Sequence, residues 1–443
     1  MCALTDPLPI EPLADGHAFD ARITPPGSKS ITNRALLIAA LARGESTLRN
    51  ALTDARDARV MIAALRKLGV GVRTDGATVS IDGAGGSLRG GAELHLGNAG
   101  TATRFLAAAC TLADAPVTLD GDPRMRERPI GELLGFLHEI GARVEALERP
   151  GFLPLRIEGG APVPGGEITI PTTLSSQYVS ALMMLAPHTR EGVTMRFTGG
   201  VTSKPYIEMT LELLSRTIGS PCEGSLDEKE IRVPPMETSH GFAIDVEPDA
   251  SGATYFFACA AIVPGARMSV PIAGAESLQP DARFVDVLRR MGATVAESDG
   301  RTIVGGTGAL RGIEADFADM PDAAMTLAVV ACFASGETTI RGLRTLRVKE
   351  TDRLEALVNE LSKIGARVEI LSEDGEEALR ITPPADPTSG QPVVFQTYDD
   401  HRMAMSLALI GLRRPGVSIA DPACADKTYP TFWNDQQRLR TPS

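Results

Sequence analysis

The sequence of 443 residues contains few cysteines, histidines and aromatic residues, and each scarcity argues against a class of protein. Its six cysteines form no CxxC pair: Cys2, Cys110, Cys222, Cys259, Cys332 and Cys424. Scattered cysteines are typical of reduced, buried thiols in a cytosolic protein rather than of a disulfide framework. The six histidines are equally dispersed. No group of residues has metal-ligand spacing, so the sequence proposes no metal site.

Long apolar runs and an excess of positive charge are also missing. No apolar run reaches the roughly 18–20 residues of a membrane span. The stretch "MCALTDPLPIEPLADG" carries acids without a basic or apolar block, so we expect neither a secretory signal nor a transit peptide. The net charge is −12 and aromatics make up 4%, whereas a general nucleic-acid binder normally has basic patches and stacking aromatics. We therefore expect a cytoplasmic protein that binds neither membranes nor nucleic acid.

The chain has a clear internal repeat. Six stretches share a small, polar start followed by a dense Ala/Leu/Met run, and they begin at Gly27, Gly97, Leu174, Asp249, Pro321 and Tyr398, 70 to 77 residues apart. Between them lie amphipathic segments that end in a helix-stop glycine, at Gly69, Gly141, Gly219, Gly292 and Gly365. Stretches such as "ARVEAL" and "ATVAES" commonly follow and predict strands.

These spacings predict six units of about 74 residues, each with a buried helix, an amphipathic helix and several strands. The period is too long for solenoid repeats, and the chain is too long for one ordinary core, so we expect the units to pack into two or more globular domains. The sixth unit lacks its second helix, which "DKTYPTFWNDQQRL" replaces in part. Accidental similarity among Ala/Leu-rich helices is the alternative, and two independent series of near-equal spacings argue against it.

Polar residues gather at the expected starts of the buried helices. They are Lys29, Ser30 and Arg34 in the first stretch, Asn98, Gly100 and Thr101 in the second, Ser175, Ser176 and Gln177 in the third, Asp322 in the fifth, and Asp400, His401 and Arg402 in the sixth. Backbone N–H groups and the helix dipole favour anions at such positions. Ser, Asn and Asp also cap helices where no ligand binds, but cations at a helix start fit capping less well. The motif "GSKS" is not a Walker A loop.

Two charged loops and one lysine add to this pattern. The loop "GDPRMRERPIG" contains Arg124, Arg126 and Arg128, the loop "LRVKETDRL" contains Arg347, Lys349, Glu350 and Arg353, and "ADKTYP" contains Lys427. Either loop alone is equally compatible with solvated salt bridges. Taken together, the candidate cations are Lys29, Arg34, Arg128, Lys349, Arg353, Arg402 and Lys427. One phosphate does not need so many cations, whereas two multiply charged anions would.

These motifs closely resemble those of the 5-enolpyruvylshikimate-3-phosphate synthase family. The matching segments occur in the family's order over nearly the whole chain: "PGSKSITNRALL", "LGNAGTATRF", "GDPRMRERPIGELL", "SSQYVSALMM", "VTSKPYIEMT", "PDAAMT", "VKETDRL", "DDHRMAMS" and "DKTYP". The resemblance implies an α/β (α+β) fold of two similar domains, each of three βαβαββ units, with the active site in the cleft between them. It places one domain at residues 27–246 and the other at residues 1–26 plus 247–443.

The resemblance also implies an activity, the transfer of the enolpyruvyl group of phosphoenolpyruvate to the 5-hydroxyl of shikimate 3-phosphate. Phosphate is released, and the reaction belongs to the shikimate pathway of aromatic amino acid biosynthesis. The family uses addition and elimination through a tetrahedral intermediate, without a metal or organic cofactor. The expected partners are therefore the two small-molecule substrates, and we expect a monomer.

Site residues follow from the same resemblance, motif by motif. The catalytic residues would be Asp322 as base for the hydroxyl, Glu350 as acid/base at the methylene carbon, and Lys29 as a partner in proton transfer. Shikimate 3-phosphate would contact Lys29, Ser30, Arg34, Ser175, Ser176, Gln177, Ser203, Tyr206, Asp322, Thr345 and Lys349. Phosphoenolpyruvate would contact Lys29, Asn98, Gly100, Thr101, Arg128, Gln177, Arg353, Arg402 and Lys427.

Two positions depart from the family pattern. Phe105 follows Arg104 where many members have proline, and its bulk could shift the helix start that carries Gly100. Thr345 stands where an asparagine often contacts shikimate 3-phosphate, and it can still donate one hydrogen bond. Members with glycine at the position of Gly100 are typically sensitive to glyphosate, so we expect sensitivity here.

Two alternatives stay open at this point. The sibling family that transfers enolpyruvate to UDP-N-acetylglucosamine usually has a reactive cysteine on a mobile loop. Here the comparable loop, "GDPRMRERPIG", has arginines and no cysteine. The other alternative is a protein that binds phosphorylated metabolites without catalysis, and the presence of Lys29, Asp322 and Glu350 argues against it.

Overall fold

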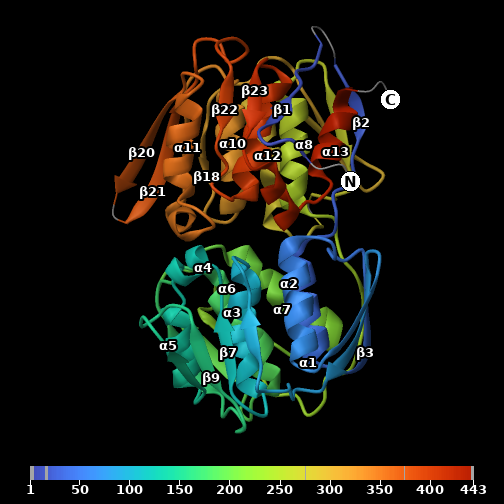
Figure 1. Ribbon diagram of the computed structural model, residues 1–443, viewed down its shortest axis with the longest axis vertical. Helices are drawn as coiled ribbons and strands as arrows, with labels where there is room; N and C mark the ends of the chain where they lie inside the picture. The colour runs from blue at the N-terminus through green and yellow to red at the C-terminus, as the bar shows by residue number, and fades with distance from the viewer. Residues whose placement is uncertain (1–3, 15–17, 275, 374, 441–443) are drawn as a thin grey trace. The chain divides into compact units, whose positions relative to one another are not determined.

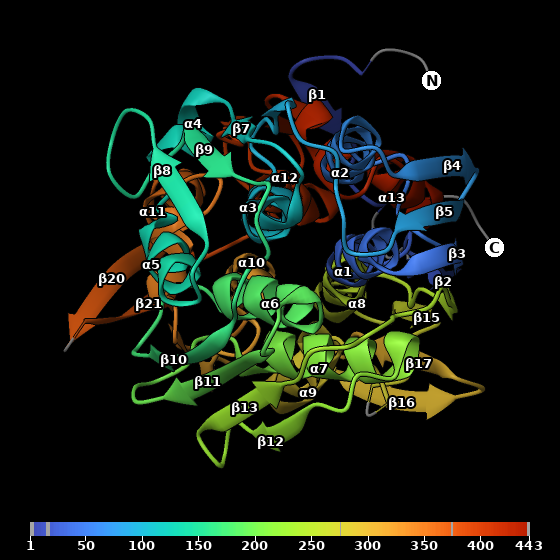
Figure 2. The same ribbon diagram turned by 90° about the horizontal axis from the view of Figure 1, so that it is seen from below.

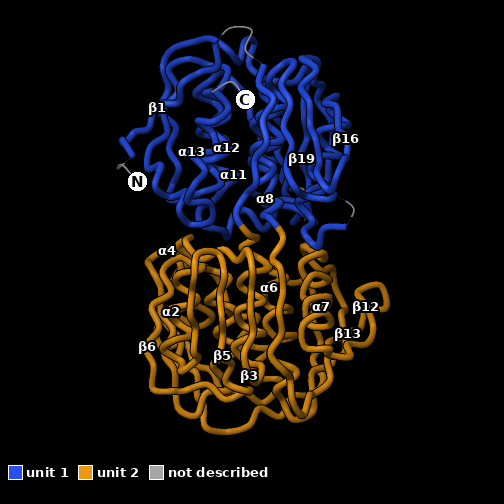
Figure 3. Tube along the Cα trace, turned by 90° about the vertical axis from the view of Figure 1, so that its right-hand side faces the viewer, with its two compact units in different colours: residues 1–26, 248–443 blue, residues 27–247 orange. Residues whose placement is uncertain are grey.

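The computed structural model describes residues 4–14, 18–274, 276–373 and 375–440 (Figure 1). The chain divides into two compact units, which Figure 3 colours separately. Unit 1 consists of Met1–Pro26 and Pro248–Ser443, and unit 2 of Gly27–Glu247. Both units alternate helices with short strands. The α/β class predicted from the sequence is confirmed.

Unit 2 contains three sheets that share one strand arrangement among the residues described. In each sheet the first strand is parallel to the second, and an antiparallel hairpin completes it. In spatial order the sheets are β14 (Ala243–Asp245), β3 (Arg43–Arg49), β5 (Thr78–Ala84) and β4 (Gly71–Asp75); β6 (Glu93–His95), β7 (Val117–Asp120), β9 (Leu155–Glu158) and β8 (Arg143–Ala146); and β10 (Gly166–Ile170), β11 (Val193–Phe197), β13 (Glu230–Val233) and β12 (Glu223–Ser225).

The helices of unit 2 are of two kinds. Three are largely buried and pack against one another: α1 (Lys29–Leu41), α3 (Gly100–Ala109) and α6 (Ser176–Leu185). The sheets lie around them, as Figure 2 shows. The others expose a polar face or are short: α2 (Arg56–Lys67), α4 (Pro123–Glu127), α5 (Gly131–Glu139) and α7 (Lys204–Ile218). Dense apolar runs place the first group in the core, whereas one apolar stripe suffices for an outer helix.

Unit 1 repeats this plan with one exception. Two sheets have the same four-stranded arrangement: β2 (Asp20–Arg22), β15 (Arg267–Val270), β17 (Arg301–Gly305) and β16 (Thr294–Ser298); and β18 (Glu314–Asp316), β19 (Thr338–Arg341), β21 (Glu376–Thr382) and β20 (Arg367–Glu373). In the third sheet, β22 (Val393–Phe395) is parallel to β23 (Val417–Ile419). The strand β1 (Leu8–Ile10) pairs antiparallel with β23, in the place that a hairpin strand takes elsewhere.

The buried helices of unit 1 are α8 (Ala250–Ile262), α10 (Ala324–Ala331) and α12 (His401–Ala408). Their hydroxyl groups form a short chain inside the core, from Thr254 to Thr326 over 3.3 Å and from Thr326 to Ser406 over 3.2 Å. The outer helices are α9 (Phe284–Met291) and α11 (Arg353–Ser362). The sixth repeat ends in α13 (Phe432–Gln437), which lies within the segment predicted to replace a full second helix.

Short 3₁₀ helices connect many of these elements. They are η1 (Cys110–Leu112), η2 (Ala186–His188), η3 (Pro280–Arg283), η4 (Pro321–Ala323), η5 (Arg344–Val348), η6 (Leu409–Leu412), η7 (Pro422–Lys427) and η8 (Arg438–Arg440). Two of the short helical elements, α4 and η5, occupy segments that we expected to be loops. Pro123 explains α4, because proline suits the first turn of a helix, where its missing N–H would have no partner.

Glycines end the outer helices as predicted. All five of the helix-stop positions have a positive φ: Gly69, Gly141, Gly219, Gly292 and Gly365. A second kind of glycine lets a strand approach the end of a buried helix. A Cβ on Gly83 would lie 2.2 Å from the carbonyl oxygen of Ala42, and one on Gly306 would lie 2.1 Å from that of Val263. The same close approach therefore recurs in both units, after α1 and after α8.

In two places, a strand and the helix that follows it in sequence belong to different units. The strand β2 precedes α1 in sequence, yet it pairs with β15 of unit 1. Likewise β14 precedes α8 in sequence, yet it pairs with β3 of unit 2. Each passage of the chain from one unit to the other thus falls between a strand and the helix that follows it.

The described cysteines are all free thiols. Cys110, Cys259, Cys332 and Cys424 are buried as predicted, and burial raises the pKa of Cys110 to about 12. Cys222 is only partly buried, so the expectation of a buried thiol was wrong for this residue, because it lies in the exposed turn after α7. Cys2 lies outside the described residues.

Candidate active site

The first helix start of unit 2 combines a cap with a buried lysine. Ser28 caps α1, and its hydroxyl accepts a hydrogen bond from the Ile31 N–H. Lys29 is the first helical residue, and its Nζ lies 3.7 Å from a carboxylate oxygen of Asp57 on α2. Asp57 was not recognised as a site residue from the sequence, because nothing local links it to α1. It supplies the negative charge that offsets a cation at the positive end of the helix dipole.

Arg34, one turn further along α1, is a buried cation whose contacts among the described residues are all with uncharged groups. Its Nε donates to the hydroxyl of Thr210 over 2.8 Å, and its Nη1 donates to the carbonyl of Ser30 over 3.0 Å. Its Nη2 donates to the hydroxyl of Ser180 over 3.1 Å and to the carbonyl of Tyr206 over 3.2 Å. Burial lowers the pKa of Arg34 to about 10, so it is still charged near neutral pH.

Four hydrogen bonds and two aromatic rings surround this guanidinium. Its Cζ lies 5.2 Å from the ring centroid of Phe105 and 5.9 Å from that of Tyr206. One of the two N–H groups of Nη1 has no acceptor among the residues that the structure describes. Arg34 also has no carboxylate partner within the described chain.

The start of α3 holds a second polar cluster. The Nη1 of Arg128 donates to the side-chain oxygen of Asn98 over 3.0 Å. Gln177, on α6, donates to the hydroxyl of Thr101 over 3.1 Å and accepts from the Nη1 of Arg104 over 2.8 Å. The structure thereby brings four of the predicted residues together around the start of one helix: Asn98, Thr101, Arg128 and Gln177.

Gly100 lies between two guanidinium groups of this cluster. A Cβ at this position would lie 2.6 Å from Nη2 of Arg128 and 2.8 Å from Nη1 of Arg104. Both arginines are 4% exposed. Arg104 was not predicted as a site residue, and only its position within "LGNAGTATRF" could have pointed to it. Phe105, next to it, is completely buried, and α3 is a regular helix from Gly100 onward.

The remaining predicted residues of unit 2 lie at the starts of α6 and α7. Ser175 caps α6 through a hydrogen bond from the Gln177 N–H, and Ser176 is the first residue of the helix. Ser203 precedes α7 with a φ of 56°, a left-handed conformation that is uncommon outside glycine. The left-handed conformation of Ser203 is a local backbone strain of the kind that is frequent at functional sites. Tyr206 is partly exposed on the first turn of α7.

Only part of the arginine-rich segment Gly121–Gly131 belongs to this cluster. Arg126 forms an ion pair with Asp120 over 2.6 Å and another with Glu148 over 3.1 Å. Arg124 pairs with Glu127 over 2.9 Å. These two arginines therefore make ordinary salt bridges, whereas Arg128 is directed to Asn98.

In unit 1, Arg353 is the centre of a buried charge network. Its Nε lies 2.7 Å from a carboxylate oxygen of Asp400, and its Nη1 and Nη2 lie 3.0 Å from carboxylate oxygens of Asp322 and Glu350. Burial lowers the pKa of Arg353, but the charges of these three carboxylates outweigh that effect and raise it overall. Asp400 was expected at a helix start from the sequence but was not predicted as a site residue.

Three cations converge on Asp322, which lies in η4, immediately before α10. They are Arg402 at 2.9 Å, Arg353 at 3.0 Å and Lys349 at 3.6 Å. The Asp322 side chain is 19% exposed, so it is accessible in part. Burial lowers the pKa of Arg402, but Asp322 and the neighbouring acidic groups raise it well above its ordinary value.

Glu350 and Lys427 form the other end of the network. Lys427 ends η7 almost completely buried, and its Nζ lies 3.7 Å from a carboxylate oxygen of Glu350. Thr345 is 3% exposed, and its hydroxyl oxygen makes no hydrogen bond with any described residue. Within unit 1, the structure thus brings together six of the predicted residues: Asp322, Lys349, Glu350, Arg353, Arg402 and Lys427.

The two clusters differ in how their charges are compensated. The cations of the network in unit 1 each contact a carboxylate. In unit 2, Lys29 has a carboxylate partner in Asp57, whereas Arg34 and Arg104 contact uncharged oxygens and aromatic rings within the described residues. Burying an uncompensated cation is costly, and an anionic ligand nearby would reduce that cost.

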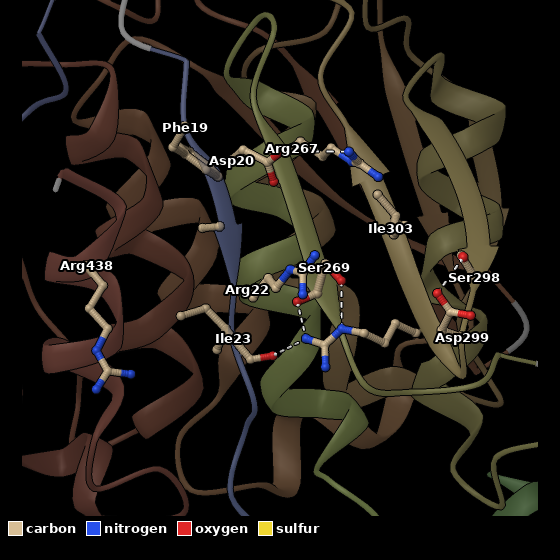
Figure 4. Close-up of a pocket in the computed structure, with 12 residues that line it drawn as sticks. Phe19, Asp20, Arg22, Ile23, Arg267, Ser269, Ser298, Asp299, Ile303 and Arg438 are labelled. Carbon is tan, nitrogen blue, oxygen red and sulfur yellow. Dashed lines mark hydrogen bonds and ion pairs between the residues drawn. The ribbon is translucent and has the colours of Figure 1, made fainter. Parts of the chain in front are cut away.

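A cavity of about 950 Å³ lies elsewhere on unit 1, beside β2, β15 and β17 (Figure 4). Four of its lining residues are arginines, and two of them, Arg267 and Arg301, contact residues of neighbouring strands. Arg301 donates to the hydroxyl of Ser269 over 2.8 Å and to its carbonyl over 2.9 Å, and Arg267 lies 3.7 Å from Asp20. None of the predicted site residues lines this cavity, so it is not part of the candidate active site.

Within the described parts of the chain, no three or more histidine, cysteine, aspartate or glutamate side chains are grouped in a way that could hold a metal ion. Across the same residues, every helix is too short or too polar to cross a membrane.

Comparisons with known proteins agree with these motifs. The model of the family "EPSP synthase (3-phosphoshikimate 1-carboxyvinyltransferase)" matches residues 13–435. A 3-phosphoshikimate 1-carboxyvinyltransferase of Salmonella schwarzengrund is 43% identical over 98% of this chain and 99% of its own, and so is one of Yersinia pseudotuberculosis. An EPSP synthase structure from Acinetobacter baumannii, 24% identical, has the same fold, with a TM-score of 0.76 over 96% of this chain and 97% of its own. This chain belongs to the EPSP synthase family.

Proposed function

We propose that the protein is a 3-phosphoshikimate 1-carboxyvinyltransferase. It transfers the enolpyruvyl group of phosphoenolpyruvate to the 5-hydroxyl of shikimate 3-phosphate by addition and elimination, and releases phosphate. The observation that carries the proposal is the convergence of Lys349, Arg353 and Arg402 on Asp322, in a chain whose relatives bear that name. A carboxylate among fixed cations can accept a proton from a hydroxyl while its neighbours hold an anionic substrate.

Within unit 1, Asp322 takes the proton from the attacking hydroxyl. Arg353, Arg402 and Lys427 bind phosphoenolpyruvate, and Lys349 and Thr345 contact shikimate 3-phosphate. Glu350 exchanges a proton with the methylene carbon, and it is held in place by Arg353 at 3.0 Å and Lys427 at 3.7 Å. These cations compensate the phosphate and carboxylate charges of the substrate and leave the reacting carbon aligned.

The groups of unit 2 complete the assignment. Ser30, Arg34, Ser175, Ser176, Gln177, Ser203 and Tyr206 bind shikimate 3-phosphate, and Asn98, Gly100, Thr101, Arg128 and Gln177 contribute to the phosphoenolpyruvate site. Lys29 contacts both substrates and takes part in proton transfer. The fixed partners of Arg128 and Gln177 support this role, because binding groups that are already ordered lose little entropy when a ligand arrives.

We also propose the domain boundaries, the cellular location and the oligomeric state of the protein, and that it needs no cofactor. The domains are residues 27–246 and residues 1–26 plus 247–443, the protein works in the cytoplasm as a monomer, and it needs neither a metal nor an organic cofactor. Light scattering on the purified protein tests the oligomeric state.

Glyphosate inhibits the enzyme, and a titration without inhibition at millimolar concentration would reject the proposed sensitivity.

Phosphate release from shikimate 3-phosphate and phosphoenolpyruvate, in buffer that contains EDTA, tests the central claim. A parallel reaction contains UDP-N-acetylglucosamine in place of shikimate 3-phosphate. Turnover in the first reaction alone is the expected result. Turnover in the second alone would identify the sibling activity, and binding of shikimate 3-phosphate without turnover would identify a non-catalytic binding protein.

A further inference from the structure

Phe105 and Arg34 come from different helices and meet in the core of unit 2. Phe105 lies on α3 and is 0% exposed, and Arg34 lies on α1 and is 1% exposed. The Cζ of Arg34 lies 5.2 Å from the Phe105 ring centroid, within the range of a cation–π interaction. Phe105 stands one residue after Arg104, at a position where the sequence departs from the family pattern.

The ring of Phe105 stabilises the buried charge of Arg34 more than it would stabilise the charge of a surface arginine. The four hydrogen bonds of Arg34 go to hydroxyl and carbonyl oxygens, and within the described residues it contacts no carboxylate. The face of an aromatic ring carries negative charge density that stabilises a cation, and the effect is larger where water is excluded. A leucine or methionine of similar volume would fill the space but would supply no such face.

We propose that Phe105 is a positioning residue for shikimate 3-phosphate, acting through Arg34. The ring holds the guanidinium in the arrangement in which Nε, Nη2 and one N–H of Nη1 donate to groups of the protein, and the other N–H of Nη1 remains for the ligand. This inference rests on the function proposed above. It adds a residue that does not touch the substrate and that sets the affinity for one of the two substrates.

Steady-state kinetics of Phe105→Leu test the proposal, with Phe136→Leu as the matched control. Phe136 is a buried phenylalanine of α5 in the same unit, and no described arginine lies over its ring. Loss of the cation–π contact raises KM for shikimate 3-phosphate about tenfold. The KM for phosphoenolpyruvate and kcat stay within about twofold of the wild type. The control lowers Tm to a similar extent and leaves both KM values unchanged.

A measurement without substrate separates the two claims. The Nε–H of Arg34, observed by NMR in protein labelled at arginine, exchanges slowly with water in the wild type and in Phe136→Leu, and faster in Phe105→Leu. Equal exchange in all three proteins, or equal KM values for shikimate 3-phosphate in both variants, overturns the proposal. A wild type that neither binds nor turns over shikimate 3-phosphate rejects the proposed function and this substrate, and the exchange rates still decide whether Phe105 positions Arg34.

Discussion

Arg353 and Asp400 form a two-point ion pair in the interior of unit 1. Nε of the arginine donates to one carboxylate oxygen over 2.7 Å, and Nη2 donates to the other over 3.3 Å. The same carboxylate accepts a hydrogen bond from the Arg402 N–H over 2.9 Å and thereby caps α12. One fully buried side chain therefore holds the guanidinium of Arg353 and caps the helix that begins beside Arg402, and we assign both arginines to phosphoenolpyruvate.

Replacing Asp400 with asparagine separates these two tasks. Asparagine still caps a helix, but it leaves the buried Arg353 without its closest counter-charge. We expect kcat/KM for phosphoenolpyruvate to fall roughly 100-fold, the equivalent of about 3 kcal/mol. The control is Asp399→Asn, since Asp399 is exposed and its φ of 51° suits asparagine. Wild-type kinetics in Asp400→Asn would show that the pair has no role in the reaction.

Lys29→Ala removes the lysine at the start of α1. Its side chain is 12% exposed and lies 3.7 Å from Asp57, so its loss also leaves a buried carboxylate without this partner. We expect a decrease in kcat/KM of at least roughly 100-fold, or about 3 kcal/mol. Lys67→Ala, an exposed position on α2, should have no effect. Near-normal kinetics in the first variant would remove Lys29 from the catalytic set.

Gly100→Ala places a methyl group against two arginines. Because the added Cβ would lie 2.6 Å from Arg128 and 2.8 Å from Arg104, both guanidinium groups must move. We expect KM for phosphoenolpyruvate to rise about tenfold, with a smaller change for shikimate 3-phosphate. Gly135→Ala is the control, since a Cβ there meets nothing within 4 Å and alanine favours the helix. An unchanged KM would place the phosphoenolpyruvate site elsewhere.

His188 should make the protein less stable in mild acid. Burial lowers its pKa to about 4, whereas the ordinary value is 6.5. Between these two values the unfolded chain binds a proton that the folded protein does not bind. The free energy of unfolding therefore has its full value above pH 6.5 as far as His188 is concerned. It decreases as the pH falls toward 4, by at most about 3 kcal/mol through this group.

Calorimetry between pH 4.5 and pH 7 measures this effect as the dependence of Tm on pH. His188→Gln should flatten the dependence, because glutamine does not titrate. His240→Gln should leave it as in the wild type, since His240 is exposed. The same slope in all three proteins would show that other groups control acid stability.

Several features of the fold could be predicted from local signals. The dense apolar runs that begin at Gly27, Asp249 and Pro321 contain three of the buried helices, and the helix-stop glycines have a positive φ. These features depend on neighbouring residues, because burial of a helix and the end of a helix are encoded by apolar periodicity and by backbone conformation. The site motifs were visible for the same reason, since each lies within one short segment.

The residues of other helices that contact those motifs could not be predicted from the sequence. Three contacts connect residues of different helices: Asp57 with Lys29, Arg104 with Gln177, and Phe105 with Arg34. No periodicity in the sequence links such positions, because their distance depends on how the helices pack against one another. Asp400 was noticed as a helix start, but its contact with Arg353, 47 residues away, appears only in the folded chain.

The sequence by itself thus determined the six-part plan, the α/β class and the positions of the charged helix starts, since these are local properties of the chain. Only the tertiary structure decided that β2 and β14 pair outside the repeats that they precede, and which cations face carboxylates and which face aromatic rings. The reason is physical: strand pairing and charge compensation are long-range contacts, and their energies depend on burial and distance in the folded protein.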